Sequence, residues 1–231
     1  MPEKSAKPKP HYLGHRQRLR ERFMATGGDG MPDYELLELL LAQAIPRRDV
    51  KPLAKTLIEE FGDFAGVISA EPLQLSKVKG MGDAAIAAVK LTKAAALRLG
   101  RQQVMDKNVI GSWDKLMDYI QAAMSHEKIE QLRLLFLNRK NVLIADEVQQ
   151  KGTVDHTPLY TREVVKRALE LGASALIIVH NHPSGDATPS DDDIAMTKEV
   201  RDALSKVGVV LHDHVIVGGG SYESFKSLGL L

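Results

Sequence analysis

The segment between residues 174 and 208 constrains the fold of this chain more than any other. The run SALIIVH is an uninterrupted series of apolar side chains up to His180, which is typical of a strand buried on both faces. A loop with Pro183, Gly185 and Pro189 follows it. SDDDIAMTKEVRDALSKVG then has the apolar spacing of an amphipathic helix, with Ser and Asp at its start. This order predicts a sheet covered by helices.

The rest of the second half alternates strands and helices. LRLLFLN and NVLIADEVQQ flank the turn NRKN and predict a β-hairpin, and VVLHDHVIVGG predicts a further strand followed by a short tail. TREVVKRALELGA predicts a helix that ends at Gly172. We therefore expect an α/β or α+β domain over residues 106–231.

The first half has a different pattern. From HRQRLRERF to about Gly100, apolar residues recur at helical spacing, and Gly62 ends one of these helices. We expect an all-helical domain over residues 11–105, with the linker near RQQVMDKNVIGSW. Residues 1–10 are rich in proline and lysine, which predicts a disordered basic tail.

Composition narrows the chemistry of the chain. The 231 residues include no cysteine, so any metal must be held by His, Asp or Glu. No apolar run reaches the length of about 18 residues that a membrane span needs, and the N-terminus lacks the apolar stretch of a signal peptide. These features predict a soluble cytoplasmic protein without a membrane partner.

Two features of the first half suggest contact with phosphate, and each has a structural alternative. The first is an excess of cations near the N-terminus, which is either a phosphate-binding arm or a solvated tail and helix. Its members are Lys4, Lys7, Lys9, Arg16, Arg18, Arg20 and Arg22. The second is the Gly80-Met81-Gly82 turn between two predicted helices, which either exposes backbone amides to phosphate, with Lys77 and Lys79 adding charge, or is a simple turn.

His180 and His182 are the strongest candidates for metal ligands. They are two positions apart at the end of a strand, so both side chains point to one face. With Asp193 from the start of the next helix they form a three-ligand set that leaves one tetrahedral position open, as in catalytic zinc sites. In the alternative interpretation, the histidines are buried and hydrogen-bonded and Asp193 caps the helix. Asp191 and Asp192 are rival ligands.

These residues also match a known motif. His180, His182, Ser190 and Asp193 have the spacing of the JAMM motif of JAMM/MPN-type metalloproteases. The wider pattern resembles the RadC family; it includes Gly152-Thr153 and Arg162-Glu163 upstream and Asp213-His214 downstream. The resemblance implies a helical N-terminal region with a helix-hairpin-helix-like segment. It also implies a C-terminal JAMM/MPN-like, cytidine deaminase-like mixed sheet flanked by helices.

The resemblance implies roles for further residues. A JAMM enzyme uses a glutamate near its first strand as the general base, which points to Glu130, with Glu147 as the rival. Ser190 would stabilise the oxyanion, although it is also a good N-cap for the helix. Zn²⁺ would activate water for hydrolysis of a peptide or protein substrate. His212 and His214 lack a following turn and carboxylate, so we interpret them as mainly structural, with His214 close to the site.

Two other functions compete with a zinc-dependent metallopeptidase or isopeptidase. One is a DNA-associated accessory protein in repair or recombination that binds DNA through its N-terminal domain. The other is a metallonuclease, which commonly needs two metals about 3.5–4 Å apart and more bridging carboxylates than the motif supplies.

Overall fold

The computed structural model describes residues 14–151 and 159–231. The predicted tail of residues 1–10 lies outside these ranges, as do Gly152 and Thr153 of the RadC resemblance. The chain divides into two units, Met1–Ala94 and Ala95–Leu231. This division lies inside helix α6 (Asp83–Val104) rather than after residue 105, because Leu97 and Val104 pack in the core of the second unit.

The segment predicted as a linker is bound to the β-hairpin of the second unit. After α6 ends, the amide of Asp106 donates to the carbonyl of Leu143 at 3.2 Å. The amide of Leu143 donates to the carbonyl of Lys107, and the amide of Val109 donates to the carbonyl of Asn141. These bonds hold residues 106–109 against the sheet, so the segment is an ordered part of the second unit.

The first unit is helical, as the sequence predicts. Its helices are α1 (His15–Thr26), α2 (Asp33–Ala44), α3 (Lys51–Phe61), α4 (Phe64–Ser69), α5 (Pro72–Lys77) and the first turns of α6. Leu37, Leu41 and Leu57 are fully buried at its centre. The predicted Gly80-Met81-Gly82 turn lies in the segment of residues 78–82 that joins α5 to α6. No helix in the described part of the chain has both the length and the apolar character that a membrane crossing requires.

The second unit is built on a five-stranded mixed sheet, which confirms the predicted α+β class. The strands are β1 (Gln131–Leu137), β2 (Leu143–Lys151), β3 (Ala175–Asn181), β4 (Val210–Gly218) and β5 (Ser221–Ser224), in the order β2-β1-β3-β4-β5. β3 and β4 are parallel, and the other neighbours are antiparallel. The predicted hairpin is the β1–β2 pair. Strand β5 was not predicted from the sequence.

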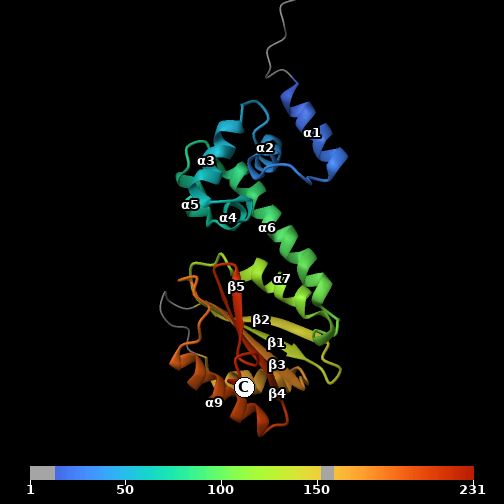
Figure 1. Ribbon diagram of the computed structural model, residues 1–231, viewed down its shortest axis with the longest axis vertical. Coiled ribbons are helices and arrows are strands. Elements are labelled where there is room, and N and C mark those ends of the chain that lie inside the picture. Colours follow the sequence, from blue (N-terminus) through green and yellow to red (C-terminus); the bar gives the residue numbers. More distant parts are fainter. Residues whose placement is uncertain (1–13, 152–158) are drawn as a thin grey trace, which may run out of the picture. The chain divides into compact units, whose positions relative to one another are not determined.

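Helices cover both faces of this sheet (Figure 1). Helix α7 (Trp113–Met124), which follows the short 3-10 helix η1 (Ile110–Ser112), packs on the face that carries Ile177 and Val179. Helices α8 (Thr161–Glu170) and α9 (Asp191–Ser205) pack on the opposite face, against Leu176 and Ile178. Because side chains alternate along β3, His180 belongs to the face covered by α9.

Candidate metal centre

His180, His182 and Asp193 come together where β3 ends and α9 begins. Ligand atoms of the three residues all lie within 4.8 Å of one another. The two Nε2 atoms are 2.9 Å apart, and the Asp193 carboxylate lies 3.2 Å from His180 Nε2 and 3.4 Å from His182 Nε2. His180 is only 1% exposed, whereas His182 and Asp193 are 19% and 14% exposed. The group is therefore buried on one side and open to solvent on the other.

Asp193 is held by the first turn of α9. Ser190 is the N-cap of this helix, and its hydroxyl accepts from the Asp193 amide at 3.1 Å. The Ser190 hydroxyl and amide donate to Asp193 Oδ2 at 2.6 and 2.8 Å. This reciprocal capping box sets the carboxylate beside the histidines. The capping role considered for Ser190 is thus present in the structure, and its oxyanion role stays a prediction.

Hydrogen bonds determine which nitrogen of His180 carries the proton. The Thr197 hydroxyl donates to the Asp193 carbonyl at 2.5 Å, so its oxygen must accept the proton of His214 Nδ1, 2.6 Å away. His214 Nε2 is then an acceptor, and it receives the proton of His180 Nδ1 at 2.7 Å. The chain of bonds leaves a lone pair on His180 Nε2, the state in which imidazole binds a metal.

His182 is arranged in the same way by a different partner. Its Nδ1 lies 2.8 Å from the carbonyl oxygen of Asp186, which only accepts, so Nδ1 carries the proton and Nε2 a lone pair. In these tautomers, His180 Nε2 and His182 Nε2 face each other at 2.9 Å with no proton between them. Two opposed lone pairs beside a carboxylate attract a cation. A proton held between the imidazoles and Asp193 fills this role in the metal-free site, and the same donor set fits a divalent metal.

The pKa shifts of the metal-free site show that it also favours a positive charge. The hydrogen bond with Asp193 raises the pKa of His182 above its usual value, and the charge of nearby Glu130 adds to this shift. Burial opposes ionisation of Asp193, but hydrogen bonds from His180 and His182 outweigh it and hold the pKa of that carboxyl well below its usual range. Full burial depresses the pKa of His214, which keeps this residue neutral.

Asn181 holds the segment that contains Glu130, just before β1, beside the candidate metal centre. The Asn181 side chain accepts from the amide of Gln131 at 2.9 Å and donates to the carbonyls of Glu127 and Ile129. The strands pair so that Leu132 is opposite His180, which places the residues just before β1 next to His182.

Glu147, the rival of Glu130, has a different environment. Its carboxylate accepts two hydrogen bonds from Arg167 Nε, at 2.9 and 3.1 Å, and one from Nη2 at 2.6 Å. Arg167 lies on α8, so Glu147 is tied to that helix. Asp191 and Asp192 are exposed and do not join the ligand group found among the described residues.

Two further residues support the site and were not predicted from the sequence. Thr197 lies four residues after Asp193 and so on the same side of α9, a helical spacing that is visible in the sequence. Asn181 lies between the two histidines and points to the opposite face, towards the segment before β1. The expected proximity of His214 to the site is confirmed by its hydrogen bond with His180.

Comparisons with known proteins agree with this geometry. The family model described as the RadC-like JAB domain matches residues 110–230, which include every residue of the candidate site. The chain belongs to the RadC family. A second model, described as UPF0758 N-terminal, matches residues 11–87. The C-terminal unit of this RadC-family protein thus carries a JAMM-type fold of the metal-dependent hydrolase class.

Two curated relatives are similar along nearly the whole chain. A UPF0758 protein from Rhodobacter capsulatus is 57% identical over 213 residues, which cover 92% of this chain and all of that protein. A UPF0758 protein from Ruegeria pomeroyi is 56% identical over 223 residues, which cover 96% of this chain and all of the relative. The similarity therefore extends over both units.

Proposed function

We propose that this RadC-family protein is a zinc-dependent hydrolase of peptide or isopeptide bonds. The observation that carries the proposal is the convergence of two bare imidazole nitrogens and one carboxylate at 2.9–3.4 Å, with one side open to solvent. Zinc takes His and Asp ligands, and three protein ligands with an open position are typical of catalytic rather than structural zinc.

Each residue of the centre has a defined task in this proposal. His180, His182 and Asp193 would hold Zn²⁺, which supplies a Lewis acid and lowers the pKa of a water molecule towards about 7. His214 and Thr197 keep His180 in the tautomer that a metal needs, and the Asp186 carbonyl does the same for His182. Ser190 orients the Asp193 carboxylate.

Glu130 is the general base in this proposal. Its charge contributes to the raised pKa of His182, and the strand register puts the residues just before β1 next to His182. Both observations support Glu130 as the group that accepts a proton from the attacking water and passes it to the leaving amine. Glu147 is held by three hydrogen bonds from Arg167, which keep its carboxylate at α8. The contacts therefore favour Glu130 over Glu147.

A metallonuclease is supported less well by the same contacts. Two-metal nucleases need carboxylates that bridge ions about 3.5–4 Å apart. The described residues supply one three-ligand group, and the neighbouring Asp191 and Asp192 point to solvent.

Paired variants of the two glutamates test the proposal. Zinc-loaded wild type, Glu130→Gln and Glu147→Gln are assayed on a panel of fluorogenic peptides and lysine-linked isopeptides, and the zinc content of each is measured. We expect Glu130→Gln to keep its zinc and lose about 10²–10⁴-fold in rate, because an amide accepts no proton. Glu147→Gln should stay active. Loss of activity in Glu147→Gln alone would transfer the role of base, and cleavage of DNA but of no peptide would overturn the proposed substrate class.

A further inference from the structure

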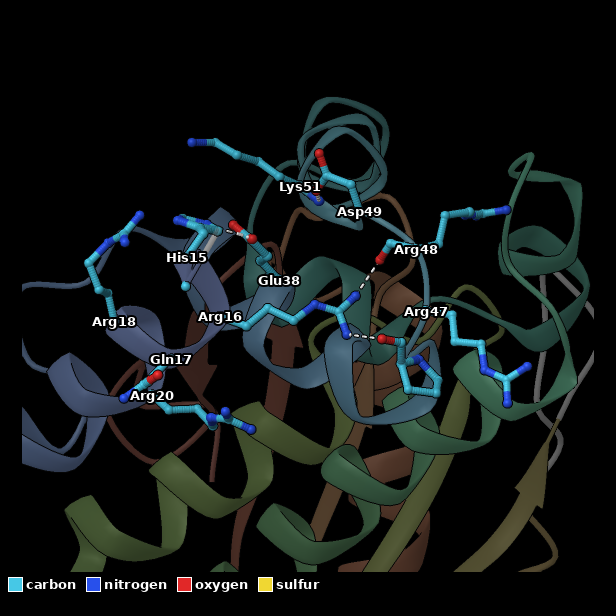
Figure 2. Close-up of a pocket in the computed structure, with 12 residues that line it drawn as sticks. His15, Arg16, Gln17, Arg18, Arg20, Glu38, Arg47, Arg48, Asp49 and Lys51 are labelled. Carbon is cyan, nitrogen blue, oxygen red and sulfur yellow. Dashed lines mark hydrogen bonds and ion pairs between the residues drawn. The ribbon is translucent and has the colours of Figure 1, made fainter. Parts of the chain in front are cut away.

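The helical unit contains a strongly basic cleft. It has a volume of about 940 Å³ and lies between α1 and the segment that joins α2 to α3. Arg16, Arg18, Arg20, Arg47, Arg48 and Lys51 line it, against two carboxylates, those of Glu38 and Asp49. Figure 2 shows the side chains of Arg47 and Arg48 extending from one wall of the cleft and those of Arg18 and Arg20 from the other.

Arg16 builds the cleft rather than offering charge to a ligand. Its guanidinium donates to the carbonyl oxygens of Ile45, Pro46 and Arg48, with distances of 3.0 Å to Ile45 and 2.5 Å to Pro46. These bonds fasten the α2–α3 segment to α1 and set the backbone from which Arg47 and Arg48 project. Five cationic side chains remain to line the opening.

Each of the two carboxylates has a partner within the protein. Glu38 is 1% exposed, and its Oε1 lies 2.8 Å from His15 Nε2. Asp49 accepts from the backbone amide of Lys51, the first residue of α3, at 3.0 Å. Arg20 and Arg47 are exposed and form no ion pair or hydrogen bond within residues 14–151 and 159–231. The cleft therefore presents unneutralised positive charge to solvent.

The chemistry of the lining selects the kind of anion. Arginine predominates, and its planar guanidinium binds phosphate oxygens in pairs. The described lining includes no Phe, Tyr or Trp on which a base would stack, which argues against a free nucleotide and against a single strand. Cations on two facing walls suit a row of phosphates whose bases are stacked inside a duplex.

We propose that this cleft binds the phosphodiester backbone of duplex DNA without reading its sequence. Arg20, Arg47, Arg48 and Lys51 contact phosphates, and Arg16 positions the two walls. The proposal places the phosphate contacts in this cleft and not at the turn at residues 78–82, where Lys77 and Lys79 are the rival cations. The inference rests on the first unit alone and does not depend on hydrolysis by the second.

A matched pair of double variants tests the site. The full-length wild-type protein, Arg20→Gln/Arg47→Gln and Lys77→Gln/Lys79→Gln are titrated with a fluorescent DNA duplex and with the corresponding single strand over a range of salt concentrations. Each variant removes two exposed cations from the same unit. Thermal unfolding shows whether both variants remain folded. A fluorescent polyglutamate serves as an anion without phosphate.

The two variants should behave differently. Each lost phosphate contact reduces the steepness of log K against log[salt] by about 0.9. Arg20→Gln/Arg47→Gln removes two contacts, so its slope should be shallower by about 2. Its affinity for the duplex should fall about 60-fold at 0.1 M salt. Lys77→Gln/Lys79→Gln should bind as the wild type does, and polyglutamate should bind more weakly than the duplex. Equal losses in both variants, a loss in the lysine variant alone, tighter binding of single strands or polyglutamate, or no salt-sensitive binding would each overturn the proposal.

Discussion

The chain contains two His-x-His pairs on neighbouring parallel strands, and they have different surroundings. His180 and His182 lie at the end of β3, where the chain leaves the sheet and the first turn of α9 brings in Asp193. His212 and His214 lie inside β4. An irregularity in the β3–β4 register falls at His212, whose Nε2 contacts the side chain of Asn141 at 2.7 Å.

The difference shows which surroundings allow a histidine to bind a metal. His214 pairs with Ile178, two residues below His180, so its imidazole lies under that ligand and is completely buried. It bonds to His180 and Thr197 and has no nitrogen left for a metal. Spacing along a strand places two imidazoles on one face, but the end of the strand and the helix beyond it decide whether they meet a carboxylate and solvent.

The largest contrast is expected when the two pairs are mutated. His180→Ala/His182→Ala removes two of three ligands, so zinc content should fall from about one ion per chain to background. His212→Ala should keep the ion, because His212 contacts Asn141 and not the metal centre. Elemental analysis of the purified proteins measures both results, with circular dichroism to show that each variant is folded. Unchanged zinc in the double variant would rule out this centre.

A smaller contrast concerns the residues that support each pair. Thr197→Val removes the acceptor of the His214 proton, and loss of such outer partners typically weakens a metal site about 10–100-fold. Asn141→Ala removes the partner of His212 and should leave zinc affinity as it was. Competition with a chromophoric chelator measures both affinities. Thr197→Ser should restore binding; equal affinity in the Val and Ser variants would show that the hydroxyl does not position His180.

The smallest expected effect is a shift in pH dependence. A protonated His182 cannot bind a metal, and Asp193 raises its pKa above the usual value of 6.5. Zinc affinity should therefore fall as the pH is lowered, and the fall should begin at a higher pH than for an ordinary histidine. Burial lowers the pKa of His212, so this residue takes up its proton at a lower pH than an ordinary histidine does. Chelator competition between about pH 5 and pH 8 tests this; an affinity that stays constant down to pH 6.5 would contradict it.

Local patterns were enough to predict most elements of the second unit. β1 to β4, α8 and α9 follow apolar spacing and turn residues in the sequence, and these signals are local. Helix α7 was not predicted, because no element was assigned between the linker and LRLLFLN, although Leu116, Ile120 and Met124 follow one another at four-residue spacing and are buried. β5 has four residues and is a strand only through its pairing with β4.

The sequence by itself determined the candidate ligands, because His180 and His182 must share a face of a strand and Asp193 must lie in the first turn of the next helix. Only the tertiary structure decided which neighbours act on them. Thr197, His214 and Asn181 form hydrogen bonds with residues of other elements. Arg167 on α8 binds the carboxylate of Glu147, the rival of Glu130. The basic cleft likewise joins residues about thirty positions apart through three bonds from Arg16. Such contacts depend on packing between elements, and sequence spacing does not encode them.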